Sequence, residues 1–178
     1  MNKKEIVKRA KKIKLIAMDI DGVLTGGEII ILQDGQEVKF WNVKDRIAFH
    51  FAKVFDLNLR FAWITGRSSQ QIRDRADEIG IDALYKNVLN KGQILDNLCE
   101  RFSLSPQDIA YIGDDLIDLP LLTKVGFAAS PSDAVSEVKN NVHFVSDCKG
   151  GRGVFREVLE VILKSQGKWR RIVKEYLK

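Results

Sequence analysis

The sequence predicts one three-layer α/β domain, in which helices cover both faces of a mostly parallel sheet. Short apolar runs alternate along the chain with amphipathic segments. This alternation is typical of βαβ units, whose parallel strands are joined by helices. Neither an internal repeat nor a Pro/Gly-rich linker divides the chain, so we expect residues 1–178 to form a single domain.

The first predicted strand is KLIAM (14–18), and it runs into the acidic stretch DIDGVLT (19–25). The segment EIIILQDGQEVKFWN (28–42) then interrupts the alternation of strand and helix. Its Asp34-Gly35 pair is a hairpin-turn signal, and apolar residues alternate along its second arm. A hairpin directly after the first strand would lie above the carboxyl edge of the sheet, where open α/β sheets bind their ligands.

The rest of the chain continues the alternation. SPQD (105–108) marks one boundary, because it combines a capping serine, a proline at the first helical position and an acid in the first turn. Short apolar runs predict strands, and longer runs of helical periodicity predict helices. The expected strands are 59–65, 109–115, 126–129 and 142–146, and the expected helices are 46–55, 69–80, 91–102 and 154–164, before a basic tail at about 165–178.

The composition is that of a soluble globular protein with a mild positive charge. Hydrophobic residues make up 45% and charged residues 30%, and the net charge of +5 suits anionic ligands. No apolar run approaches the roughly 20 residues that span a membrane, and the basic N-terminus lacks the pattern of a secretory signal. Cys99 and Cys148 form no CxxC pair, and His143 is expected to pack within a strand rather than to bind zinc. We therefore expect a cytoplasmic protein without membrane insertion.

Polar motifs follow four of the predicted strands. They are DIDG (19–22), WITGR (63–67), NKG (90–92) and YIGDDLID (111–118). Because parallel strands end at one edge of a sheet, these motifs should converge on one cleft. The residues that we expect there are Asp19, Asp21, Thr65, Lys91, Asp114 and Asp115.

Several carboxylates beside one lysine are the groups that a Mg²⁺ site for phosphate chemistry needs. Mg²⁺ prefers hard oxygen ligands and shares its coordination shell with substrate phosphate oxygens. A carboxylate at such a site would attack phosphorus and form an aspartyl-phosphate. Lys91 and the Thr65 hydroxyl would stabilise the developing charge. Asp21 fits the role of acid and base because it lies only two residues from Asp19.

The four motifs, in this order, resemble those of the haloacid dehalogenase superfamily of phosphatases. The match consists of DIDGVLT, ITG, Lys91 and GDDLID. It implies a Rossmann-like sheet, with Asp19 as nucleophile and Asp21 as acid and base. It also implies Mg²⁺ bound by Asp19, Asp114 and the backbone carbonyl of Asp21. The acids that the resemblance places behind these ligands are Asp115 and Asp118.

A receiver-type signalling domain is an alternative of a different class. It also places Mg²⁺, a phosphorylatable aspartate, a threonine and a lysine on a doubly wound sheet. A receiver carries its acid pair after the first strand and its phospho-acceptor after the third, whereas the third-strand position here holds no isolated aspartate. A regulatory or scaffolding relative without activity is a further alternative, and the intact set of acids argues against it.

Short intervals between the motifs leave no room for a large cap domain, so the hairpin is the expected flap. A phosphatase without a cap acts on a macromolecule or borrows a lid from a partner subunit, because excluding water favours phosphoryl transfer. Finer motifs favour the borrowed lid. WNVKD (41–45), ITGRSS (64–69) and GGRG (150–153) resemble the family of 3-deoxy-D-manno-octulosonate 8-phosphate phosphatases, over about residues 14–167.

That resemblance implies a homotetramer in which the hairpin and the C-terminal tail cover a neighbouring site. It implies a small-molecule sugar-acid phosphate as substrate and a place in lipopolysaccharide precursor synthesis. The implied substrate contacts are Asp21, Asn42, Val43, Lys44, Asp45, Arg67, Arg75 and Lys91.

Two positions depart from the family pattern. Arg46 stands where the family usually has glycine, and His50 where it usually has arginine. The two residues are one helical turn apart and share a face. Our hypothesis is that both contact the substrate, with Arg46 supplying the guanidinium that is missing at position 50. The alternative is a solvated Arg46 and a related substrate, such as a sialic acid 9-phosphate.

Two basic segments near the C-terminus complete the sequence. KGGRG (149–153) places Arg152 at a helix start, which is a ready anion site or, more commonly elsewhere, a plain loop. The tail combines Trp169 with lysines and arginines, a pattern that also suits a nucleic acid or a membrane surface. We expect the tail to pack on a neighbouring subunit, and we expect no nucleic-acid partner.

Overall fold

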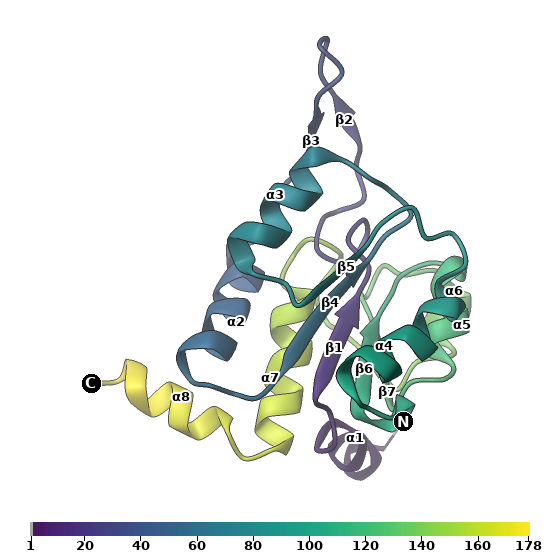
Figure 1. The fold of residues 1–178 in the computed structure, drawn as a ribbon. Coiled ribbons are helices and arrows are strands. Elements are labelled where there is room, and N and C mark those ends of the chain that lie inside the picture. The colour runs from purple at the N-terminus through teal and green to yellow at the C-terminus, as the bar shows by residue number, and fades with distance from the viewer. Residues whose placement is uncertain (1) are drawn as a thin grey trace.

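A computed structural model describes residues 2–178, and it confirms the three-layer α/β fold (Figure 1). Within these residues, six strands form one sheet in the order β5-β4-β1-β6-β7-β8, and every neighbouring pair is parallel. The strands are β1 (Leu15–Met18), β4 (Arg60–Ile64), β5 (Ala83–Tyr85), β6 (Ile109–Ile112), β7 (Phe127–Ser130) and β8 (Phe144–Val145).

Two hydrophobic clusters, one on each face of the sheet, make up the core. Alternate residues of β1 point to opposite faces, so Ile16 and Met18 join one cluster while Leu15 and Ala17 join the other. The first face is covered by α1 (Lys3–Ala10), α2 (Val43–Val54), α3 (Gln70–Ile79) and α7 (Val154–Ser165). The second is covered by α4 (Ile94–Phe102), α5 (Leu119–Leu122) and α6 (Ser136–Lys139). In the described part of the chain, no helix has the length and apolar character to cross a bilayer.

The predicted hairpin is present and projects beyond the carboxyl ends of the strands (Figure 1). β2 (Ile30–Ile31) pairs antiparallel with β3 (Glu37–Val38). The turn forms around Asp34, whose carboxylate accepts a hydrogen bond of 3.0 Å from the backbone of Gln36. Apolar side chains of this hairpin are exposed to an unusual degree, among them Ile31 at 66%.

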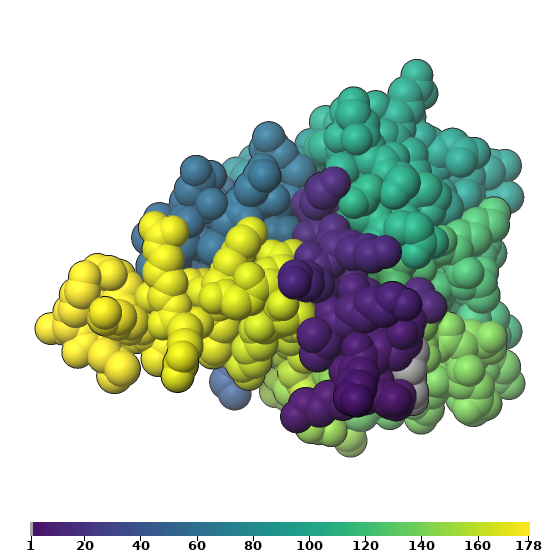
Figure 2. All heavy atoms as spheres, turned by 90° about the horizontal axis from the view of Figure 1, so that it is seen from below, coloured from purple at the N-terminus to yellow at the C-terminus, as the bar shows by residue number. Residues whose placement is uncertain are grey.

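The basic tail forms α8 (Trp169–Tyr176), which packs on its own chain at the end of the sheet opposite to the hairpin (Figure 1). Ile172 is buried, and the rings of Trp169 and Tyr176 lie 6.0 and 5.6 Å from the ring of Phe51 in α2. Seen from below, the N-terminal segment lies beside α7 (Figure 2), and the Gln166 side chain donates to the Ile13 carbonyl. A role for the tail at a neighbouring subunit's site stays a prediction.

His143 packs beside β8 and has a structural role, as expected. Its Nδ1 accepts a hydrogen bond of 2.8 Å from the backbone of Ala128 in β7, and its ring stacks on Phe127. Burial and the nearby Arg9 hold the pKa of His143 below its usual 6.5. Protonation of Nδ1 would remove this acceptor and break the bond between the two segments.

The stability of the protein should therefore fall as His143 becomes protonated. A base whose pKa is lowered on folding binds its proton more tightly when unfolded, so the free energy of unfolding falls as pH drops below 6.5 towards the folded pKa. His143→Asn keeps an acceptor atom at the same branch of the side chain but does not titrate. We expect thermal unfolding across this pH range to show a smaller loss of stability for His143→Asn than for the unmodified protein. Equal losses in both proteins would contradict this assignment.

Candidate active site

The carboxyl ends of four strands bring the sequence-predicted residues together around one buried lysine. Asp19 follows β1, Thr65 follows β4, Lys91 lies in the short helical turn Lys91–Gln93 after β5, and Asp114 follows β6. Lys91 is completely buried, and its Nζ lies 2.7 Å from Asp19 Oδ2 and 2.7 Å from Asp118 Oδ1. Lys91 thus pairs with one acid from the loop after β1 and with one acid from the loop after β6.

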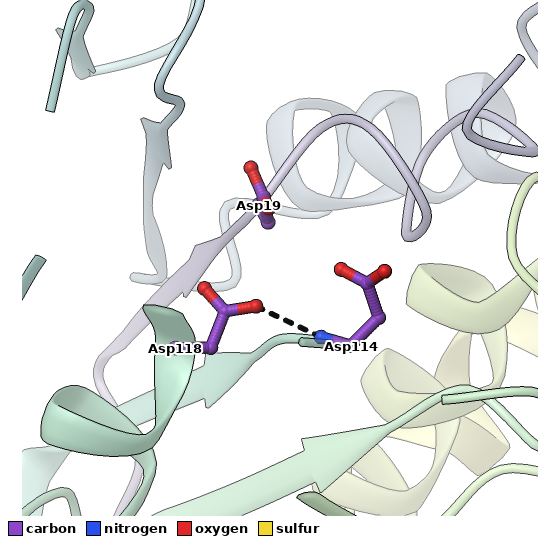
Figure 3. A group of neighbouring side chains, drawn as sticks. All are labelled: Asp19, Asp114 and Asp118. Carbon is purple, nitrogen blue, oxygen red and sulfur yellow. Dashed lines mark hydrogen bonds between the residues drawn. The ribbon is translucent and has the colours of Figure 1, made fainter. Parts of the chain in front are cut away.

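Three carboxylates form a compact acidic cluster at this edge (Figure 3). Asp19, Asp114 and Asp118 each offer an oxygen, and these atoms all lie within 4.8 Å of one another. Burial raises the pKa of Asp19 to about 6. Burial, together with the charges of Asp19 and Asp118, raises the pKa of Asp114 to about 8. Negative charge is therefore in excess here, and a bound cation would relieve it.

The three carboxylates of the cluster differ in the hydrogen-bond partners that the chain gives their oxygens. Asp114 Oδ1 is buried and has no hydrogen-bond partner within residues 2–178. Both oxygens of Asp118 already accept hydrogen bonds. Oδ1 accepts from the side chains of Lys91 and Tyr111, and Oδ2 accepts from the backbone of Asp114 and Asp115. Asp118 therefore orients the lysine and the loop, while Asp19 and Asp114 keep oxygens that fit a hard divalent cation such as Mg²⁺.

A glycine is required where the first acidic loop meets the fourth motif. Gly22 has φ +91°, and a Cβ atom added there would lie 2.0 Å from Asp114 Oδ2. Any side chain at this position would displace the Asp114 carboxylate and strain the backbone. The loop that contains Gly150 packs on the same turn, since a Cβ at Gly150 would lie 2.1 Å from the Gly22 carbonyl oxygen. DIDG is therefore a tight turn that packs directly against Asp114.

Asp21 is held by groups from its own loop and from the hairpin. Its Oδ1 accepts a hydrogen bond of 3.2 Å from the Thr25 hydroxyl and also contacts the ammonium group of Lys39. Lys39 in turn pairs with Glu37, whose other oxygen lies 2.5 Å from Arg67 Nη2. Sequence reasoning missed Glu37 and Lys39, although the alternation of apolar residues along this arm places both on the same face of the strand.

Thr65 directly follows β4, at the same edge of the sheet as the acidic cluster. Its side chain is buried, and its Oγ1 accepts a hydrogen bond of 3.1 Å from the backbone of Arg67. The hydroxyl proton is thereby left available for donation to a phosphate oxygen. Asp115, which we also expected in the cleft, is instead exposed, and its side chain caps the short helical turn Leu116–Asp118.

Three predicted substrate residues, Asn42, Val43 and Asp45, lie around the start of α2, where two of them make structural contacts and one is exposed. Asn42 caps the helix through a 2.9 Å hydrogen bond from Lys44, and its amide donates to the Gly151 carbonyl. Val43 is exposed. Asp45 is buried and accepts a hydrogen bond of 2.8 Å from the backbone of Arg156 in α7, and burial raises its pKa to about 6. Asp45 therefore fastens α7 through one carboxylate oxygen. Its Oδ2 is buried and has no hydrogen-bond partner among residues 2–178, so its contact with the substrate stays a prediction.

The remaining predicted substrate residues gather around Glu78 of α3. Arg46 Nε and Arg75 Nη1 lie 3.1 and 2.5 Å from the two oxygens of Glu78. Arg46 and His50 line the same small groove, as their spacing on one helix face predicts. Among the described contacts, none joins Arg46, His50 or Arg75 to the acidic cluster, so their contact with a substrate stays a prediction.

Comparisons with known proteins show which family the chain resembles. A family of haloacid dehalogenase-like hydrolases matches residues 83–158. The 3-deoxy-D-manno-octulosonate 8-phosphate phosphatase KdsC of Escherichia coli strain K12 is 37% identical over 164 residues, which are 92% of this chain and 86% of that protein.

Solved structures show the same relationship. The Yersinia pestis 3-deoxy-D-manno-octulosonate 8-phosphate phosphatase is 36% identical, with a TM-score of 0.88 over 92% of this chain and 88% of that one. The Moraxella catarrhalis enzyme, solved with magnesium, phosphate and KDO, is 35% identical, with a TM-score of 0.93 over 97% and 98% of the two chains. The chain therefore belongs to the haloacid dehalogenase-like hydrolases and, within them, to the family of 3-deoxy-D-manno-octulosonate 8-phosphate phosphatases, which are phosphoric monoester hydrolases.

Proposed function

We propose that the chain hydrolyses 3-deoxy-D-manno-octulosonate 8-phosphate to the free sugar acid and inorganic phosphate, with Mg²⁺ as cofactor, in lipopolysaccharide precursor synthesis. The observation that carries the catalytic part is the buried Lys91, paired with Asp19 and Asp118 beside the partnerless oxygen of Asp114. The names of the relatives support the choice of substrate.

Asp19 is the nucleophile in this proposal. Its carboxylate attacks phosphorus, the ester P–O bond breaks, and an aspartyl-phosphate forms on Asp19. Lys91, 2.7 Å from Asp19, is placed to balance the charge that builds up on the phosphoryl oxygens. Thr65 donates its hydroxyl proton to one of the same oxygens. Bound Mg²⁺, held by Asp19, Asp114 and the backbone carbonyl of Asp21, would supply further charge stabilisation.

Asp21 completes the cycle as acid and then base. It gives a proton to the leaving sugar oxygen as the ester bond breaks, and afterwards takes one from the water that attacks the aspartyl-phosphate. A single carboxyl group thus serves both steps and returns to its starting state.

Removal of Mg²⁺ with a chelator should stop turnover, and adding Mg²⁺ back should restore it.

The exposed apolar hairpin supports a homo-oligomer, which we propose to be a tetramer. Ile30, Ile31, Leu32 and Phe40 are between 38% and 69% exposed, and several exposed apolar side chains on one projecting hairpin favour a protein interface there. A second copy that covers these side chains would also supply the lid that this fold lacks.

A phosphate-release screen tests the substrate directly. The purified enzyme is assayed with Mg²⁺ on 3-deoxy-D-manno-octulosonate 8-phosphate, on a sialic acid 9-phosphate and on simple sugar phosphates. We expect the highest kcat/KM for the eight-carbon acid phosphate. Preference for the nine-carbon acid would favour the alternative substrate, and no release from either acid phosphate would overturn the substrate while leaving the family intact.

A further inference from the structure

Lys39, at the end of the second hairpin arm, ties the flap to the acids of its own chain. Its ammonium group contacts Asp21 Oδ1 and lies 2.8 Å from Glu37 Oε1. Only 1% of the Lys39 side chain is exposed, so this cation is withdrawn from water although it belongs to a projecting hairpin. A buried charge is tolerated when paired with opposite charges, so both carboxylates are needed to hold the lysine there.

Glu37 extends this contact to the loop after β4. Its second oxygen lies 2.5 Å from Arg67 Nη2, so Asp21, Lys39, Glu37 and Arg67 form a chain of alternating charges. Burial opposes ionisation of Glu37, but the hydrogen bonds from Arg67 and Lys39 prevail and lower its pKa. The chain of ion pairs therefore fixes the hairpin arm between the loop after β1 and the loop after β4.

The two oxygens of Asp21 have different surroundings. Oδ1 has two donors, the Thr25 hydroxyl and the Lys39 ammonium group. Oδ2 is buried and has no hydrogen-bond partner in the described part of the chain. The carboxyl group is thus anchored through one oxygen, while the other is left without a partner from the described residues.

We propose that Lys39 is a positioning residue of the phosphatase reaction, which together with Thr25 anchors Asp21 so that Oδ2 delivers the proton to the leaving group. The proposal rests on the acid and base role of Asp21 in the proposed function. As the ester P–O bond breaks, its electron pair stays on the leaving oxygen, and the proton moves from Oδ2 to that oxygen. An Asp21 that is free to turn adopts the reactive orientation less often, so protonation slows.

Leaving-group dependence tests this role in the Lys39→Met variant. The ratio kcat/KM reports the steps up to the breaking of the ester bond. A sugar phosphate releases a poor leaving group that needs a proton, whereas p-nitrophenyl phosphate releases a good one that does not. We expect Lys39→Met to lose about 10- to 100-fold in kcat/KM on the sugar phosphate and far less on p-nitrophenyl phosphate. This loss is smaller than the roughly 10²- to 10⁴-fold that a general acid contributes, because Asp21 itself is still present. Lys39→Arg should recover most of the loss.

Controls separate this role from a general loss of structure. Lys12→Met makes the same change at an exposed lysine at the far end of the sheet, and both substrates should keep their rates. If Lys39→Met does not fold, Glu37→Gln can be tested instead, because it weakens the ion pair that holds Lys39. The loss of kcat/KM should then be smaller, but again greater on the sugar phosphate than on p-nitrophenyl phosphate. Equal losses on both substrates, or no loss on the sugar phosphate, would overturn the proposal.

The same experiment distinguishes failure of this proposal from failure of the proposed substrate. Any alkyl phosphate monoester that the unmodified enzyme hydrolyses can replace the eight-carbon acid phosphate in the comparison. An enzyme inactive on that acid phosphate would refute the substrate, whereas the contrast between alkyl and aryl leaving groups would still decide the role of Lys39.

Discussion

Asp19→Asn is expected to lower kcat by about 10⁴- to 10⁶-fold, as removal of a nucleophile does in other enzymes with covalent intermediates. The amide has nearly the shape of the carboxylate and can still accept the 2.7 Å hydrogen bond from the backbone of Ile20. It cannot attack phosphorus, because the amide oxygen is a poor nucleophile. Steady-state phosphate release with Mg²⁺ measures the loss.

The fold should survive the Asp19→Asn exchange. Burial raises the pKa of Asp19 to about 6, so the folded state opposes ionisation of this side chain relative to the unfolded state, and a neutral amide is tolerated in its place. Thermal unfolding should therefore stay close to that of the unmodified protein. Asp34→Asn, in the exposed hairpin turn, is the matched control and should keep full activity. Substantial residual activity of Asp19→Asn would mean that another group attacks phosphorus.

Lys91→Met should damage stability and activity together. Lys91 is completely buried between Asp19 and Asp118, and removing one partner of a buried ion pair typically costs about 3–5 kcal/mol in the free energy of unfolding. The cation that balances the phosphoryl oxygens is lost as well, so kcat should fall by about 10²- to 10³-fold. Urea unfolding and phosphate release measure the two losses.

The loss of stability in Lys91→Met should depend on pH in a defined direction. Lys91 lowers the pKa of Asp19 against the opposing effect of burial, so its removal moves that pKa further upward. A carboxyl group with a raised folded pKa stabilises the fold while protonated, and this stability is lost as pH rises through that pKa. The deficit of Lys91→Met should therefore be smaller at mildly acidic pH than at neutral pH. A deficit that is constant or larger in acid would contradict the pairing.

Much of the fold and of the site could be predicted because each polar motif directly follows a recognisable apolar strand, and the order of the strands fits a parallel sheet. The acids follow apolar strands, and parallel strands end at one edge, so Asp19, Thr65, Lys91 and Asp114 had to converge once the strands were identified. The hairpin could also be predicted from the sequence, since Asp34-Gly35 fits the turn that the structure shows.

What could not be predicted depends on side chains that meet across long sequence separations. The contact of the Asp45 carboxylate with the start of α7 joins residues that are 111 positions apart, and no local pattern near residue 45 predicts it. The same holds for Lys39, whose pairing with Asp21 depends on how the hairpin folds back over the first loop. The docking of the tail on Phe51 likewise follows from three-dimensional packing rather than from the tail's charge.

Acid quenching during turnover tests the central claim most directly. The enzyme is mixed with 3-deoxy-D-manno-octulosonate 8-phosphate and Mg²⁺, stopped in acid during steady-state release, and digested for peptide mass analysis. We predict a phosphoryl group on the Asp19 side chain, together with many phosphates released per chain. A phosphoryl group on another residue, turnover without any label on Asp19, or a single burst of one phosphate per chain would contradict this account.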